Sequence, residues 1–127
     1  NNALELAHCL LEHSKIDTVF YPGLDTHSGF DTATKQMKGF GGVLSFSLSG
    51  TEDLIPAFLT KLNFAHAAAH LGSVDTIVGP PKTTSHVENT IEERSYLGIP
   101  ENLVRCSVGI ENIDDIKRDF LQALDQL

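Results

Sequence analysis

The sequence predicts an α+β fold, a mainly antiparallel four-stranded sheet with helices on one face. Segments whose apolar residues recur at helical spacing alternate along the chain with short runs typical of strands. Two of these runs, 43–49 and 103–109, alternate polar and apolar residues, as strands do when only one face of their sheet is covered. We expect the uncovered face to meet water, a ligand or another domain, and function to lie there.

Apolar spacing predicts a helix over 2–14. Further helices are expected over about 28–37, ending in Lys38-Gly39, and near 90–96. A further helix is expected after Thr51, which is a candidate N-cap, although Pro56 inside it indicates a later start. The last helix begins at the cap Asn112. Its expected buried stripe is Ile113, Ile116, Phe120, Leu124 and Leu127.

Four strands are expected, at 17–21, 43–49, 73–78 and 103–109. The first stops at Pro22-Gly23 and the third at Gly79-Pro80-Pro81. In the second, three apolar residues should face the core and three serines the open side. These are Leu44, Phe46 and Leu48 against Ser45, Ser47 and Ser49. No repeat or long linker interrupts the chain, so we expect one domain over residues 1–127.

Composition disfavours two classes of partner. Nine basic against seventeen acidic residues give a net charge of −8, which repels nucleic-acid phosphates and anionic lipids. No apolar run approaches the roughly 20 residues that cross a bilayer, and the chain does not open with a secretory signal. The missing initiator methionine leads us to expect a piece of a longer chain. The two cysteines, Cys9 and Cys106, fit buried free thiols and a cytoplasmic protein.

Arg105 is the strongest candidate for a binding residue. On its strand, Val104, Cys106, Val108 and Ile110 should face the helices, which leaves Arg105 and Ser107 on the open side. A planar guanidinium suits bidentate capture of a carboxylate, and the simpler alternative is a surface arginine in a local ion pair.

Several ordered motifs cover nearly the whole chain. They are Tyr21-Pro22-Gly23-Leu24, the run Gly39-Phe40-Gly41-Gly42 with Leu44-Ser45-Phe46, Thr84-Ser85-His86, Glu92-Glu93-Arg94, Leu97-Gly98-Ile99, the run 103–111 (LVRCSVGIE) and Asp114-Asp115-Ile116. Together they resemble the trans-sulfuration (Cys/Met metabolism) family of pyridoxal-phosphate enzymes, which includes cystathionine gamma-synthase, cystathionine gamma-lyase, methionine gamma-lyase and acyl-homoserine sulfhydrylases.

The resemblance implies a carboxy-terminal substrate-binding domain of a larger enzyme, usually a homotetramer. In the family, the cofactor lysine and most contacts with pyridoxal phosphate belong to a large domain that these residues lack. It therefore implies no catalytic and no cofactor-binding residue here, and an inactive fragment. The arginine at the position of Arg105 binds the substrate α-carboxylate. Substrates would be cystathionine, methionine or O-acyl-homoserines, and synthase, lyase and sulfhydrylase reactions all stay open.

One position departs from the family pattern. Many members read Glu-Ser-Leu-Gly-Gly where this chain has Ala69-His70-Leu71-Gly72-Ser73. The resemblance implies that the serine there helps to place the carboxylate, so His70 is a second candidate substrate-binding residue. Its imidazole offers a hydrogen-bond donor in place of the hydroxyl, or it narrows the pocket.

Other signals have simpler explanations. His66 and His70 stand at metal-ligand spacing for a helix but have no evident third ligand, so no metal is expected. Ser85 and His86 are adjacent, a poor geometry for a nucleophile and its base. The glycines 39–42 lack the spacing of a phosphate-binding loop. The competing hypothesis for the whole chain is a free-standing, non-enzymatic α+β module that binds a ligand or dimerises through its open sheet face.

Overall fold

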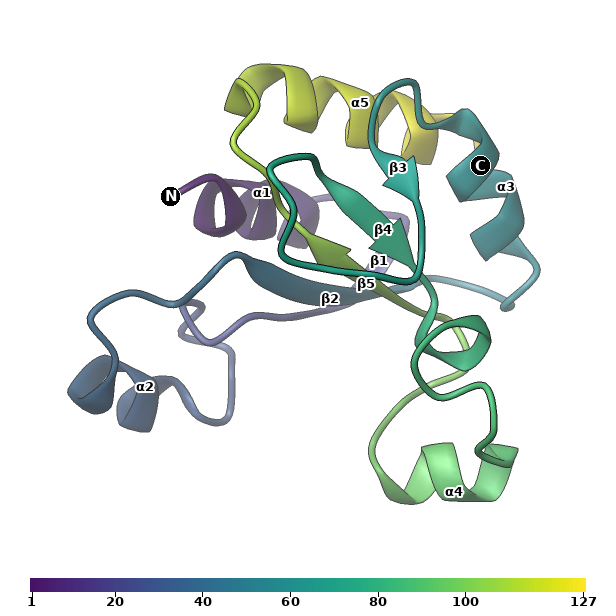
Figure 1. The fold of residues 1–127 in the computed structure, drawn as a ribbon, viewed down its shortest axis with the longest axis horizontal. Coiled ribbons are helices and arrows are strands. Elements are labelled where there is room, and N and C mark those ends of the chain that lie inside the picture. Colours follow the sequence, from purple (N-terminus) through teal and green to yellow (C-terminus); the bar gives the residue numbers. More distant parts are fainter.

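A five-stranded sheet with three helices on one face forms the body of the computed structural model, which describes residues 1–127 (Figure 1). The strand order is β1-β2-β5-β4-β3. The strands are β1 (Ile16–Phe20), β2 (Val43–Leu48), β3 (His66–Ala67), β4 (Ile77–Gly79) and β5 (Leu103–Ser107). Three of the neighbouring pairs are antiparallel, and β3 pairs with β4 in parallel. The α+β prediction is confirmed, with β3 as one strand more than expected.

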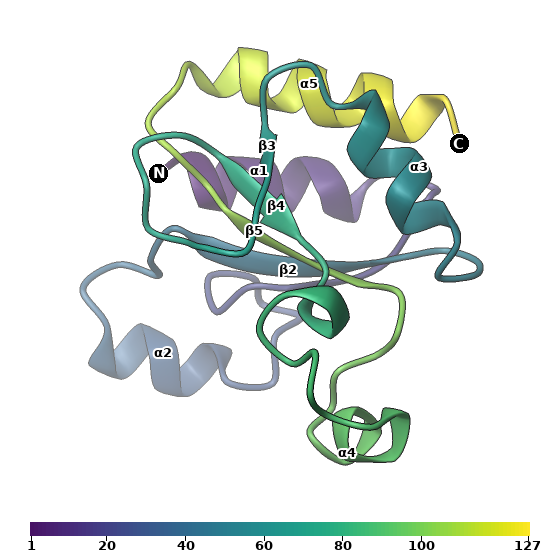
Figure 2. The ribbon, with the colours of Figure 1, turned by 45° about the vertical axis from the view of Figure 1, so that its right-hand side comes forward.

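Helices α1 (Asn2–Leu11), α3 (Leu54–Lys61) and α5 (Ile113–Asp125) lie on the same face of the sheet, as Figure 2 shows from a second angle. Helices α2 (Phe30–Gln36) and α4 (Ile91–Tyr96) project on the opposite side, as does the short 3-10 turn Pro81–Thr83. None of the helices combines the length and the apolar character that a membrane span requires. The layer order leaves much of one sheet face without a helical cover.

The core lies between the sheet and the three helices. Phe46 of β2, Phe58 of α3 and Phe120 of α5 meet edge to face, with ring centroids 5.8 to 6.3 Å apart. Val104 and Cys106 of β5 are fully buried against the same cluster. The alternation therefore places Leu44, Phe46 and Leu48 of β2 under the helices together with this pair, as the sequence predicts.

Two local expectations are wrong. The N-cap of α3 is Asp53 and not Thr51, so the later start that Pro56 indicates is confirmed. Pro56 lies in the first helical turn, where no intrahelical partner exists for a backbone N–H. Ile110 is 80% exposed and does not face the core, because β5 ends at Ser107 and the chain then turns away from the sheet. The cap Asn112 and the short helix at 91–96 are confirmed, the latter with a complete capping box at Thr90.

Asp119 of α5 is a buried carboxylate that secures the chain after α3. Its oxygens accept hydrogen bonds from the backbone N–H groups of Asn63 (2.6 Å), Phe64 (3.3 Å) and Ala65 (3.0 Å). The side chain is only 1% exposed, so the protein must replace the water that the charge loses on burial. Asp119 thereby fixes the approach of the chain to β3.

Arg94 holds the projecting helix α4 in place. Its guanidinium donates to Glu101 at 2.6 and 3.2 Å and to the backbone carbonyls of His86 and Asn89. These hydrogen bonds lower the pKa of the Glu101 carboxyl, against the smaller effect of its burial. A six-residue helix is too short to be stable alone, so this ion pair is what orders α4.

Removing the Asp119 carboxylate should destabilise the fold strongly. Asp119→Ala leaves three N–H groups without their charged acceptor, and we expect the free energy of unfolding to fall by about 2–4 kcal/mol in urea denaturation. The matched control is Asp114→Ala, which removes an exposed carboxylate from the first turn of the same helix and should cost about 0.5 kcal/mol. Equal losses in the two variants would contradict the assigned role of Asp119.

The pairing of Glu101 with Arg94 should make the order of α4 depend on pH. Because the folded state lowers the pKa of Glu101, its stabilisation is complete above the unfolded value and is lost as pH falls through the folded value. Limited proteolysis should therefore begin to cut at residues 86–101 once the pH falls below 4.5, the ordinary pKa of a glutamate carboxyl. Glu101→Gln should be cut there at neutral pH as well, and protection of this variant at neutral pH would refute the assignment.

Candidate functional site

Arg105 lies on the side of the sheet away from the helices. In the strand register it pairs with Ser45 of β2 on one side and Gly79 of β4 on the other. Its sequence neighbours Val104 and Cys106 are buried in the core, so strand alternation directs the arginine to the open face. The half-buried side chain is thus placed at the middle of the sheet, on the face that the sequence singles out for function.

The guanidinium of Arg105 has no carboxylate partner. Its Nη2 donates to the main-chain carbonyl of Ala69 at 2.8 Å and to that of His70 at 3.4 Å, and these are its only hydrogen bonds within the protein. The other two arginines, Arg94 and Arg118, both pair with acids. The local ion pair considered as the simpler explanation is therefore absent, and Nε and Nη1 remain free to bind an anion.

The 68–76 segment, between β3 and β4, packs across the open face of β5 (Figure 1). The N–H of Gly72 donates to the hydroxyl of Ser107 at 2.9 Å, and the N–H of Ala68 donates to the Val78 carbonyl at 3.0 Å. Gly79 permits this close approach, because a Cβ there would stand only 2.7 Å from the Ala68 carbonyl oxygen. The segment therefore supports the guanidinium from one side.

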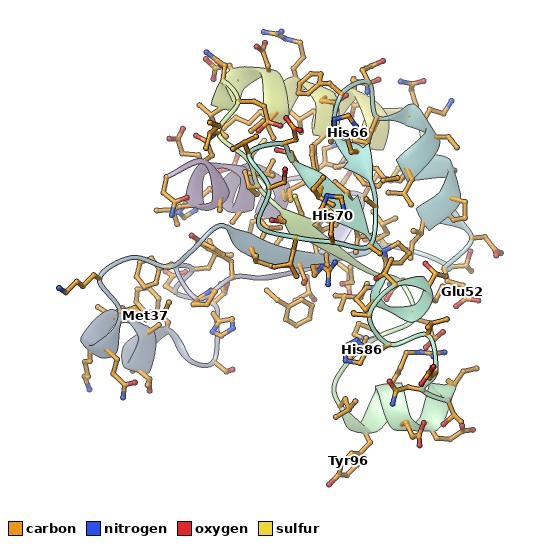
Figure 3. The ribbon with its side chains drawn as sticks, in the orientation of Figure 1. Met37, Glu52, His66, His70, His86 and Tyr96 are labelled. Carbon is orange, nitrogen blue, oxygen red and sulfur yellow. The ribbon has the colours of Figure 1, made fainter.

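The two candidate substrate-binding residues, His70 and Arg105, are neighbours in the structure. The contact runs through the main chain of His70, whose side chain is exposed and makes no hydrogen bond with the protein. His66 belongs to β3 and not to a helix, as Figure 3 shows, with His70 on the segment that follows. No group of three or more histidines, cysteines or acids is placed to hold a metal ion.

The other reactive side chains form no catalytic set. Ser85 and His86 share a hydrogen bond of 2.8 Å between Oγ and Nδ1, but no acidic side chain orients the imidazole. Burial raises the pKa of the Cys106 thiol far above its ordinary range, and burial also raises the pKa of Cys9. Both thiols are free, as expected, and such shifts make a cysteine a poor nucleophile.

Sequence reasoning missed three parts of this site. It did not anticipate the bond from Gly72 to Ser107, the close approach of the chain at Gly79, or the hydrogen bonds that join Thr76 to Glu111. The only available signal was the glycine that ends the 73–78 strand pattern, since a glycine there can mark a close backbone approach.

Comparisons with known proteins agree with this architecture. Residues 1–125 match the family model described as Cys/Met metabolism PLP-dependent enzyme. The chain is 40% identical to L-methionine gamma-lyase of Fusobacterium nucleatum subsp. nucleatum over 126 residues, which cover 99% of this chain and 32% of that protein. It is also 40% identical to chloroplastic cystathionine gamma-synthase 1 of Nicotiana tabacum, with 100% of this chain and 24% of that protein covered.

A solved structure of cystathionine gamma synthase from Xanthomonas oryzae pv. oryzae, in complex with cystathionine, superposes with a TM-score of 0.94 at 37% identity. The match covers 98% of this chain and 32% of that one, so these residues span between about a quarter and a third of the length of the relatives named. The family match extends over almost every residue, and the fold agrees with it. The chain belongs to the Cys/Met metabolism family of pyridoxal-phosphate-dependent enzymes.

Proposed function

We propose that residues 1–127 form the carboxy-terminal, substrate-binding domain of a trans-sulfuration enzyme of the gamma-synthase or gamma-lyase type, in which Arg105 binds the α-carboxylate of an amino-acid substrate. The observation that carries the proposal is a half-buried arginine without an acidic partner on the open face of the sheet. The names of its relatives, methionine gamma-lyase and cystathionine gamma-synthase, support the reaction class.

The geometry around Arg105 suits capture of a carboxylate. Two neutral carbonyls, those of Ala69 and His70, hold Nη2 and fix the plane of the guanidinium without cancelling its charge. The N–H groups of Nε and Nη1 and the second N–H of Nη2 make no hydrogen bond with the protein, so a carboxylate can gain charge-assisted hydrogen bonds from them, which are about twice as strong as neutral ones. Anchoring the carboxylate restricts the rotation of the substrate and so orients its Cα–H bond for the reaction.

His70 would form one wall of the same pocket. Its main chain contacts Arg105, and its exposed imidazole makes no hydrogen bond with the protein, so a ring nitrogen is free to donate to a substrate oxygen. The side chain is larger than the serine that it replaces in the family pattern. We therefore propose that His70 both binds substrate and limits the size of what enters.

The residues present do not by themselves fit pyridoxal phosphate. Lys82 and Lys117 are occupied in ion pairs with Glu52 and Glu5. Lys117 is the one lysine that lines a cavity, of about 370 Å³, and Glu5 and Glu12 in the same cavity repel a phosphate. When bound, the cofactor serves as an electron sink, and the groups that hold it would belong to the rest of the parent enzyme.

The proposal extends to the whole parent protein. Its substrates would be cystathionine, methionine or O-acyl-homoserines, and its chemistry elimination or replacement at the γ or β carbon. The solved relatives are described in complex with cystathionine, and with aminoacrylate and cysteine, which supports sulfur amino acids as the substrate class. We further propose a cytoplasmic homotetramer, in line with the expectations from the cysteines and from the family resemblance.

Replacing Arg105 in the full-length enzyme should weaken substrate binding. Arg105→Ala removes two charge-assisted hydrogen bonds, so we expect kcat/KM for L-cystathionine or L-methionine to fall by about 10² to 10³, mainly through KM. Arg105→Lys should recover only part of the loss, because an ammonium group lacks the planar fork. Cofactor binding, followed by its visible absorbance, should not change.

The matched control for this experiment is Arg118→Ala, which removes an exposed arginine of α5 that pairs with Asp115. It should leave kcat/KM within about 2-fold of the wild type, because surface pairs of this kind contribute little. If Arg105→Ala shows the kinetics of this control, the carboxylate site lies elsewhere and the proposal fails.

A further inference from the structure

We infer that Glu111 is a positioning residue for the carboxylate site, acting through Thr76 on the 68–76 segment that supports Arg105. The inference rests on the proposed function and deepens it, because it names a residue that sets the affinity of the site without touching substrate. Glu111 forms no ion pair, and its carboxylate accepts hydrogen bonds from the backbone N–H and the hydroxyl of Thr76.

Both carboxylate oxygens of Glu111 accept hydrogen bonds from Thr76. Oε1 accepts the backbone N–H of Thr76 at 2.6 Å, and Oε2 accepts its hydroxyl at 2.9 Å. The same hydroxyl oxygen accepts the N–H of Gly109 at 3.0 Å. Thr76 is completely buried, and hydrogen bonds in such a chain strengthen one another in a low dielectric. The arrangement fixes Thr76 against the end of β5.

The contact between Thr76 and the chain that follows β5 is tightly packed around Gly109. A Cβ at Gly109 would overlap with the Val74 carbonyl oxygen and with the Glu111 carboxylate, so only glycine fits there. The N–H of Ile110 donates to the Val74 carbonyl at 2.9 Å. Asn2 of α1 donates from its side chain to the carbonyls of Gly109 and Glu111, at 3.1 and 2.8 Å. The turn after β5 is thereby fastened to the helical layer.

Thr76 links Glu111 and Gly109 to the segment that holds Arg105. The Thr76 carbonyl accepts the N–H of His66 at 2.9 Å, which closes the base of the 68–76 segment at β3. Farther along, the segment contacts β5 through Gly72 and through the carbonyls that hold the Arg105 guanidinium. Fixing Thr76 therefore sets where those carbonyls stand. If the base loosens, the guanidinium loses its support and must be ordered again when the carboxylate binds, which lowers affinity.

The test uses the full-length enzyme with Thr76→Val, an isosteric change that removes the hydroxyl shared by Glu111 and Gly109. We expect KM for L-cystathionine or L-methionine to rise by about 10-fold while kcat stays within about 2-fold, since the loss lies in binding. Thr76→Ser restores the hydroxyl and should return KM to within about 2-fold of the wild type. Glu111→Ala should reproduce the Thr76→Val result.

The control variant is Ser73→Ala, which deletes a hydroxyl from the same segment. The only hydrogen-bond partner of that hydroxyl is the backbone N–H of Asp75. Its KM should match the wild type. An unchanged KM in Thr76→Val, or a loss confined to kcat as expected from partial unfolding, would overturn the inference.

A double variant separates this inference from the proposed function. In an Arg105→Ala background, Thr76→Val should cause no further rise in KM, because the residue that it positions is gone. An additive effect would overturn the positioning role. If Arg105→Ala raises KM and Thr76→Val does not, only the inference fails. If Arg105→Ala itself leaves KM unchanged, the proposed function fails and the inference fails with it.

Discussion

The structure depends on β5 having two chemically different faces. One side of the strand buries Val104 and Cys106 under the helices, and the other presents Arg105 and Ser107 to the 68–76 segment. Because side chains alternate strictly along a strand, the burial of the apolar pair fixes the direction of the arginine. A slip of one residue in the pairing of β5 with β2 would put a charge into the core, so hydrophobic burial itself holds the candidate site in register.

The environment of Arg105 explains how an acidic protein can offer a site for an anion. Seventeen acidic against nine basic residues give the chain a net charge of −8, which opposes the approach of a carboxylate from a distance. Locally, the guanidinium is held by two carbonyls and not by any of these acids, so its positive charge is not neutralised. The two neutral carbonyls therefore order the guanidinium and leave its charge available to bind an anion.

Patterns along the chain were enough to predict the layers of the fold. Alternation in 43–49 and 103–109 predicted the one-sided sheet, and helical spacing predicted α1 and α5 close to their observed bounds. The strand β3 was missed because its two residues lie in an alanine-rich stretch that carries no period. The start of α3 and the exposure of Ile110 depend on where single turns end, which spacing does not determine.

The candidate site was predictable only in part, for a physical reason. The direction of Arg105 follows from its own strand, and the resemblance to the family supplies a role for it. Ala69, which holds the Arg105 guanidinium, lies more than thirty positions before it in the sequence, and Thr76 lies as far from Glu111. Gly79 meets Arg105 only through strand pairing. Tertiary packing brings these residues together. The sequence contains the residues that make such contacts, but it does not show which residues of distant segments lie opposite one another.

The most direct measurement of the central claim is a crystal structure of the full-length enzyme with its amino-acid substrate bound. The account predicts the α-carboxylate within hydrogen-bonding distance of the Arg105 guanidinium, with Ala69 still supporting Nη2. A carboxylate bound by a different cation, with the Arg105 side chain facing only solvent or protein, would contradict it.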